Sequence, residues 1–101
     1  MVYCYNGTMN PINNLVTEKV IENLASRSNL RYGKQMAQED SVTFIKHNSH
    51  NIVAEVKHGN SEKRTVQLIS TPKGLRWKCT CTSKKDLFCN HCVAVALSAI
   101  K

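Results

Sequence analysis

Long apolar runs are missing from this chain of 101 residues, and so is a basic-then-apolar leader. No run approaches the roughly 20 residues that a membrane-spanning helix needs. Met1 to Thr8 is too short and too polar for a secretory signal. We therefore expect an intracellular protein without a membrane partner, cytoplasmic in a prokaryotic or archaeal cell and nuclear in a eukaryotic one. In such a reducing compartment, clustered cysteines favour metal binding over disulfides.

The groups that are typical of enzyme active sites are also missing. The sequence contains no evident Ser-His-Asp set, paired carboxylates or phosphate-cradling glycine loop. His47 and His50 are three apart in a segment expected to be extended, which points them to opposite faces. His58 is expected in a turn. We therefore predict a protein that is not an enzyme and has no small-molecule substrate.

Acidic residues are scarce: the chain has seven, against 14 lysines and arginines, for a net charge of +7. Residues 61–101 hold eight bases and two acids, so this segment carries +6 of the total. Bases gathered on one part of a small domain are typical of a protein that binds a polyanion. The alternative is a solvated face that only aids solubility.

Five cysteines cannot all pair, which argues against a disulfide framework. Four residues near the C-terminal end have instead the spacing Cys-x-Cys-x7-Cys-x-His: Cys79, Cys81, Cys89 and His91. Three thiolates and one imidazole form a complete tetrahedral set for one structural Zn²⁺ ion, with no open position for a substrate. The alternatives are a Cys-x-Cys redox pair, a chance cluster of buried cysteines, and an iron–sulfur cluster that also uses Cys92.

Hydrophobic periodicity predicts a helix over residues 10–27. Its apolar residues follow a helical period along one stripe: Ile12, Leu15, Val16, Val20, Ile21 and Leu24. Asn10 supplies a capping side chain and Pro11 a first-turn proline, and both are start signals. Residues 26–33 are expected to interrupt the helical pattern.

Between residues 41 and 79 the apolar period changes to two, which is typical of β-strands. We expect strands near 42–44 and at 52–57, 63–70 and 75–79. Gly59-Asn60 is expected to form a tight turn, and Thr71-Pro72-Lys73-Gly74 a type II turn. These elements predict an antiparallel meander of three or four strands.

A second helix is expected from Asn90, which could cap it, because apolar residues then recur along one stripe: Val93, Ala94, Leu97 and Ile100. Cys92 is expected as a small buried side chain on this helix, whereas Cys4 is uninformative. The predicted fold class is therefore α+β in a single domain, residues 1–101. An N-terminal helix, an antiparallel sheet, a zinc loop and a C-terminal helix packed on the sheet follow in that order.

The residues around the candidate ligands resemble the SWIM zinc finger. Trp77–Cys81 and Cys89–Leu97 match that family's Cys-x-Cys, variable gap, Cys-x-His and apolar helix. The finger corresponds to residues 77–100, and with the strands before it the resemblance covers about residues 30–101. The family occurs in Swi/Snf-type ATPases, Mu-type transposases, a MAP-kinase-kinase kinase family and recombination mediators. The resemblance implies a zinc-dependent module that binds DNA or protein and has no catalytic role.

Two residues depart from the family pattern. Cys92 stands where an aliphatic residue is usual, and Asn90 stands where many members have lysine. The first change is expected to be benign. The second removes a basic contact at that point.

The first functional hypothesis is nucleic-acid binding, with DNA as the expected partner and with low sequence specificity because no recognition-helix motif is evident. The candidate contacts are the bases that flank the finger: Lys73, Arg76, Lys78, Lys84 and Lys85. Trp77 lies between two of them and could stack on an unpaired base. It also shares a strand face with Cys79, which favours a place in the core.

The second hypothesis is a protein-interaction adaptor. A small SWIM protein without an ATPase or transposase domain would act through a partner, and family analogy suggests a recombinase paralogue. The helix expected over 10–27 could be the docking element. The simpler interpretation is that its apolar stripe covers the sheet.

Overall fold

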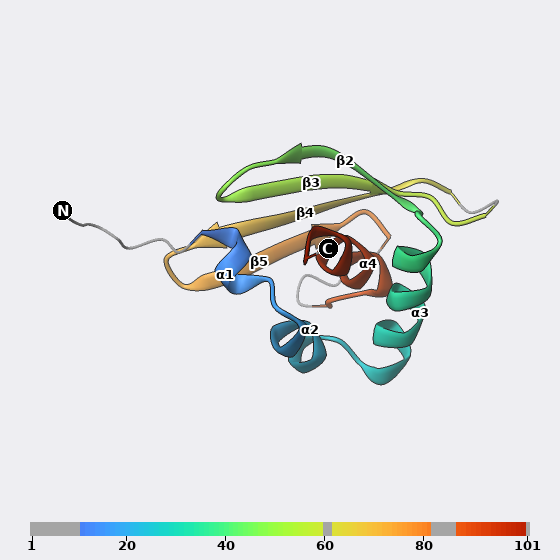
Figure 1. Cartoon of the computed structure of the whole chain (residues 1–101), viewed down its shortest axis with the longest axis horizontal. Helices are drawn as coiled ribbons and strands as arrows, with labels where there is room; N and C mark the ends of the chain where they lie inside the picture. Colours follow the sequence, from blue (N-terminus) through green and yellow to red (C-terminus); the bar gives the residue numbers. More distant parts are fainter. Residues whose placement is uncertain (1–10, 60–61, 82–86, 101) are drawn as a thin grey trace.

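The computed structural model describes residues 11–59, 62–81 and 87–100, which form the α+β fold that the sequence predicts (Figure 1). None of the helices in these ranges has the length and apolarity that crossing a bilayer requires. The elements follow one another in the order α1 (Ile12–Leu15), α2 (Glu18–Leu24), α3 (Arg27–Gln38), β2 (Val42–His47), β3 (Asn51–Val56), β4 (Arg64–Thr71), β5 (Gly74–Cys79) and α4 (Asn90–Ile100).

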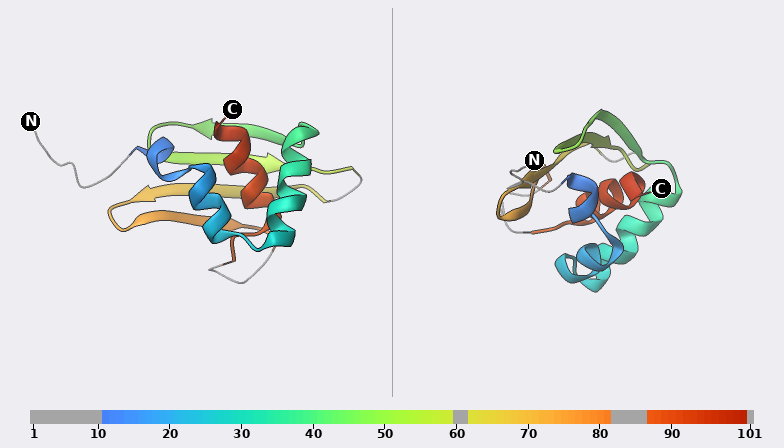
Figure 2. Two further views of the ribbon diagram at one scale, coloured as in Figure 1. Left: turned by 60° about the horizontal axis from the view of Figure 1, so that its bottom comes forward. Right: turned by 60° about the vertical axis from the view of Figure 1, so that its left-hand side comes forward.

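The sheet is the predicted antiparallel meander, with strand order β2-β3-β4-β5. Val66 of β4 pairs with Ala54 of β3 on one side and with Cys79 of β5 on the other. A bulge between Phe44 and Lys46 interrupts the register of β2. Figure 2 shows the helices gathered on one face of the sheet. No described element covers the other face.

The core lies between the sheet and α4. Inward residues of β3 and β4 alternate with half-buried outward ones, as period-two strands require. The inward side chains and the start of α4 are fully buried: Ile52, Ala54, Val66, Leu68, Cys92, Val93, Ala94, Val95 and Ala96. The predicted packing of the C-terminal helix on the sheet is thereby confirmed.

The apolar stripe of the N-terminal region belongs to this core as well. Ile12, Val16 and Ile21 are buried in the same cluster as the sheet residues. The stripe therefore covers the fold through these three residues, as the simpler interpretation expects.

The predicted helix over residues 10–27 is two shorter helices in the structure. α1 ends at Leu15, and α2 begins at Glu18 after Thr17, whose Oγ1 accepts a hydrogen bond from the Val20 N–H at 3.2 Å. A threonine whose hydroxyl caps a helix has an extended backbone at that point, so it cannot also be an interior residue of a longer helix. Pro11 occupies the N-cap of α1, and the predicted cap, Asn10, lies outside the described residues.

The predicted interruption at residues 26–33 is wrong, because α3 runs through it. The Ser26 Oγ accepts a hydrogen bond from the Asn29 N–H at 3.2 Å and caps the helix. Gly33, which resembles a helix breaker in the sequence, is buried in the middle of α3. A Cβ at this position would overlap the side chain of Val93 and lie 2.9 Å from the Asn90 carbonyl oxygen. Glycine is thus required by close packing on α4.

The turn between β4 and β5 is not the type II turn expected. Type II needs a positive φ at its third residue, here Lys73, and the only described non-glycine residue with a positive φ is Asp40. Proline at the second position and Gly74, with φ +118, at the fourth suit a type I turn. The Thr71 hydroxyl stabilises it by donating to the Gly74 carbonyl at 2.7 Å. At the preceding turn, Gly59 has φ +61, and Asn60 lies outside the described residues.

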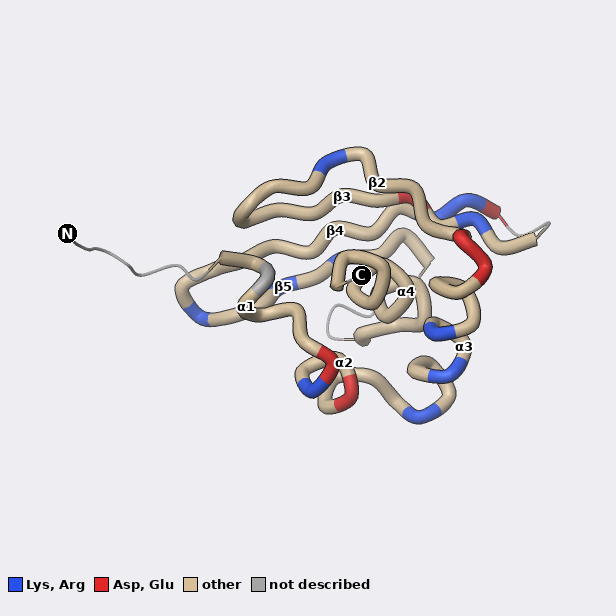
Figure 3. The backbone as a smooth tube through the Cα atoms, in the orientation of Figure 1, with Lys and Arg blue, Asp and Glu red and all other residues tan. Residues whose placement is uncertain are grey.

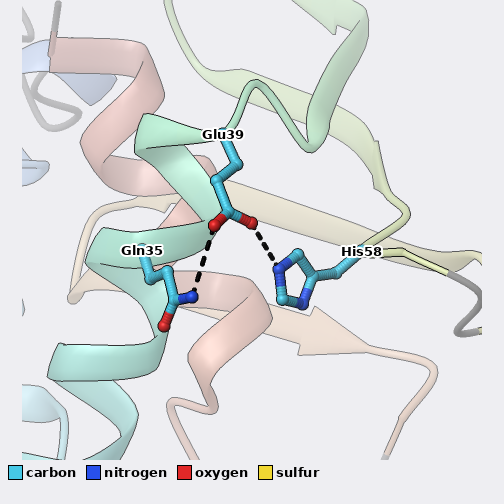
Figure 4. A network of polar contacts seen from close by, with 3 residues as sticks. All are labelled: Gln35, Glu39 and His58. Carbon is cyan, nitrogen blue, oxygen red and sulfur yellow. Dashed lines mark hydrogen bonds and ion pairs between the residues drawn. The ribbon is translucent and has the colours of Figure 1, made fainter.

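A polar network joins the end of α3 to the β3–β4 connection (Figure 4). The Glu39 carboxylate lies 2.6 Å from His58 Nε2 and accepts a hydrogen bond from the Gln35 amide at 3.3 Å. The hydrogen bond with His58, followed by that from Gln35, lowers the pKa of Glu39 below its ordinary 4.5. The network holds the charge of Glu39 at the C-terminal end of α3.

Candidate metal centre

The two ends of the candidate centre are positioned by β5 and α4. Cys79 is the last residue of β5, and Cys81 follows two residues later. Cys89 directly precedes α4, and His91 is its second residue. The sulfur and ring-nitrogen ligand atoms of these four residues all lie within 4.8 Å of one another. The structure therefore brings together the four residues that the sequence singles out.

The chain around Cys79 and Cys81 is fixed by pairing that continues beyond β5. Thr80 donates its N–H to the Thr65 carbonyl at 3.1 Å, and its hydroxyl accepts the Thr65 N–H at 3.0 Å. This exchange holds the peptide between the two cysteines against β4. The first half of the ligand set is thereby tied to the rigid sheet.

The second half of the ligand set is anchored by an aromatic contact. Phe88, next to Cys89, is buried and meets the ring of Trp77 edge-on, with centroids 5.2 Å apart. Trp77 is partly buried and packs against the core, and its Nε1 is the one buried side-chain nitrogen or oxygen atom in the described ranges without a hydrogen-bond partner. The contact places Cys89 beside the end of β5. It favours the packing role for Trp77 over stacking on a base.

The start of α4 differs in one detail from expectation. Asn90 is the first residue of the helix, not its cap. The Cys89 carbonyl accepts the N–H of Val93 at 3.0 Å and so begins the helical hydrogen-bonding pattern. A candidate metal ligand therefore occupies the capping position, which couples the geometry of the four-residue cluster to that of the helix.

The distances within the cluster suit a tetrahedral ion. Cys81 Sγ lies 3.4 Å from Cys89 Sγ, and Cys89 Sγ lies 3.8 Å from His91 Nδ1. Zinc–sulfur bonds of about 2.3 Å would set neighbouring sulfurs about 3.8 Å apart in a tetrahedron. None of the four described cysteines forms a disulfide. These four residues could therefore hold one metal ion.

The close approach and burial of the ligand side chains shift their pKa values. Hydrogen bonding to Cys79 and then to Cys89 raises the pKa of His91 to about 9. Burial raises the pKa of Cys81, and hydrogen bonding from Cys79 lowers that of Cys89. Thiols and imidazole bind a cation in their deprotonated forms, so a metal ion competes here with protons.

Cys92 is buried on α4, as predicted, and it borders the cluster. Its Sγ lies 3.8 Å from that of Cys89. Hydrogen bonding to Cys79 and then to Cys89 raises the pKa of Cys92. A fully buried thiol with a raised pKa remains protonated and behaves as a small packing residue.

Gly33 is the residue near the centre that sequence reasoning missed. It lets α3 approach α4 at Asn90 and Val93, immediately beside the ligands of α4. The signal in the sequence is the spacing of Leu30, Gly33 and Met36, which share one helical face if the glycine is counted as a packing residue.

The candidate nucleic-acid contacts fall into two groups. Lys73 lies in the β4–β5 turn, whereas Arg76 and Lys78 are exposed on alternate positions of β5, opposite Ile69 and Gln67 of β4. Both therefore project from the sheet face that the helices do not cover. Lys84 and Lys85 lie outside the described residues.

No family model, curated protein or solved structure matches this chain.

Proposed function

We propose that this protein is a structural-zinc module that binds nucleic acid, DNA in particular, with low sequence specificity and without catalysis. The observation that carries the proposal is the meeting of a complete Cys3His donor set, within 4.8 Å, with exposed bases on the neighbouring elements. The resemblance to the SWIM finger supports it and suggests a role in recombination, repair or mobile-element biology.

Zinc is the proposed ion because thiolate and imidazole together suit this borderline-soft cation. Cys79 and Cys81 would hold it from the end of β5, and Cys89 and His91 from the start of α4. Four protein ligands leave no position for a substrate. The ion would close the fold and fix the surfaces around it.

Charge supports a polyanionic partner. Two groups of exposed bases occupy separate elements: Lys73, Arg76 and Lys78 around β5, and Arg27, Arg31 and Lys34 on α3. Three acids are already engaged, Glu39 with His58, Glu55 with Lys63 and Glu62 with Arg64. None of the six bases of these two groups forms an ion pair within the described ranges, so they are free to meet phosphates.

Binding of the zinc-loaded protein to a fluorescent oligonucleotide, measured by anisotropy at increasing salt, tests this proposal. Because each neutralised phosphate of a duplex contributes a slope of about −0.9 in log K against log salt, we expect a slope of about −3 or steeper. An oligonucleotide of equal length and unrelated sequence should bind within a few-fold. Absence of binding at low salt, or affinity that salt does not change, would refute the proposal.

An adaptor role is the second candidate, and one observation favours it. β2 is an edge strand, and its Phe44 and Ile45 are among the exposed large apolar side chains, with Ile45 59% exposed. An unpaired strand edge with apolar side chains is a typical site for a protein partner, such as a recombinase paralogue. Stable capture of such a partner by the native protein, lost in an Ile45→Lys variant, would support this role.

A further inference from the structure

We propose that α3 is the element that contacts double-stranded DNA, through an outward stripe formed by Arg27, Arg31 and Lys34. The inference rests on the proposed nucleic-acid function and names the surface and the form of nucleic acid. It differs from the contacts expected around β5, which lie on another element.

The stripe follows from how α3 packs. Gly33, Met36 and Ala37 are buried on the side that faces α4. Arg27, Arg31 and Lys34 are exposed and separated by four and three positions, so they share the opposite side of the helix. Figure 3 shows basic positions following one another along α3. The helix thus has one anchored side and one basic side.

No ion pair neutralises this stripe within the described ranges, although the preceding helix α2 carries Glu18 and Glu22 and Asp40 follows Glu39. α3 contains no acidic residue from Arg27 to Gln38, and none of its three bases has an ion pair within the described ranges. Glu39, just beyond the helix, is held by His58 and Gln35 (Figure 4). Bases in the first two turns also add to the positive end of the helix dipole, an arrangement that lowers helix stability. The resulting positive field suits an anionic partner.

The sheet side is electrostatically weaker. Lys63 lies 3.5 Å from Glu55, which shares the open sheet face, and Arg64 lies 3.8 Å from Glu62. The open sheet face therefore carries one acid, Glu55, beside its bases, whereas α3 carries none. We infer that the sheet face contributes less to binding than α3 does.

The shape of α3 suits a duplex. A helix with its side chains is about 10–12 Å across, close to the width of about 12 Å of the DNA major groove. The three bases span about 10 Å along the helix axis, and a duplex carries one charge per about 1.7 Å, so each base has a phosphate within reach. Tyr32, 51% exposed and 5.7 Å from the Arg31 guanidinium, adds a hydroxyl donor beside the stripe.

The metal centre would hold this surface in place. Gly33 brings α3 against α4 at Asn90 and Val93, between and beside the ligands Cys89 and His91. A fixed α4 therefore fixes the position of α3. The basic stripe and the proposed zinc ion are mechanically connected through this contact.

Two triple variants that lose the same charge from different faces test the inference. Arg27→Gln/Arg31→Gln/Lys34→Gln removes the α3 stripe, and Lys46→Gln/Arg76→Gln/Lys78→Gln removes bases of the open sheet side. Glutamine is a good helix former, so α3 should persist. At about 0.1 M salt, we expect the α3 variant to bind a duplex about 100-fold more weakly, with a salt slope shallower by about 2.7. The sheet variant removes bases that also support the proposed function, so it should lose some affinity, but at least about 10-fold less than the α3 variant loses.

Each outcome decides between the proposals. Equal losses of duplex affinity in the two variants would mean that only net charge matters. Native-like duplex binding by the α3 variant would show that α3 is not the contact. Either result overturns this inference and leaves nucleic-acid binding intact. An equal loss for single strands would overturn the preference for duplex. If the native protein binds no oligonucleotide, both proposals fall. Should the triple α3 variant fold poorly by circular dichroism, Arg31→Gln and Lys34→Gln alone should each cost about 5-fold in duplex affinity.

Discussion

Removal of the metal from the native protein should unfold at least the C-terminal third of the chain. The four donors join the end of β5 to the start of α4, and the residues that follow them, Cys92–Ala96, are fully buried. Structural zinc supplies about 10–16 kcal/mol in small zinc domains, as much as the whole stability of a typical domain. Loss of the ion should therefore remove α4 from the core.

Far-UV circular dichroism with and without a strong chelator measures this effect. We expect a marked loss of helical signal that returns when zinc is restored. Cys89→Ser should behave like the chelated protein, because it removes a ligand, whereas serine keeps the backbone carbonyl that begins α4 and is itself a favourable N-cap. Cys4→Ser, which alters a cysteine outside the ligand set, should leave the spectrum native. An unchanged spectrum in chelator would show that the fold does not depend on a metal.

Gly33→Ala should destabilise the protein by about 2 kcal/mol. In an exposed helix the same change would add up to about 1 kcal/mol of stability, because alanine is the better helix former. At Gly33 the new methyl group would overlap Val93 and lie 2.9 Å from the Asn90 carbonyl oxygen. Overpacking of this kind costs about 1–3 kcal/mol. The Asn90 oxygen belongs to the backbone and cannot rotate away as a side chain can, so α3 and α4 would have to move apart.

Urea unfolding of the zinc-loaded protein measures this change. Ser28→Ala is the matched control, since Ser28 is an exposed residue of the same helix and alanine there should be neutral or slightly stabilising. Because α4 carries Cys89 and His91, Gly33→Ala should also weaken zinc binding, whereas Ser28→Ala should not. A Gly33→Ala protein as stable as the control would contradict the close approach of α3 and α4.

Much of the fold follows from periodicity alone. The period-two segments of 41–79 became β2 to β5 in the expected order, because alternation fixes which face of each strand is buried. The apolar stripe after Asn90 became α4 for the same reason, with a period of 3.6. The four candidate ligands can be predicted from residue type and spacing. In particular, the side chains of Cys79 and Cys81 point the same way because strand residues two positions apart share a face.

The errors arose where one residue had two possible roles. Ser26 and Gly33 predict an interruption of the helical pattern, but the serine caps α3 and the glycine is required by contact with α4, which only the tertiary structure reveals. Thr17 looked like an interior helix position and instead begins α2. Lys73 and Gly74 suggested a type II turn, although the glycine is one position too late for it.

The distribution of charge over the surface is the feature that the sequence predicts least well. Counted along the chain, residues 1–60 carry only +1, which draws attention away from them. In space, Arg27, Arg31 and Lys34 share one side of α3, and of the two acids that follow the helix, Glu39 is bound to His58. The net charge summed over residues 1–60 therefore does not reveal the basic stripe of α3 on which the proposal of duplex binding rests.

Metal content is the most direct measure of the central proposal, that Cys79, Cys81, Cys89 and His91 grip a single cation. Native mass spectrometry and elemental analysis of protein purified without added metal should find one zinc ion per chain, and a His91→Ala variant should retain substoichiometric zinc at most. Metal-free protein that is nevertheless folded, or a stoichiometric ion that survives loss of these ligands, would contradict the account.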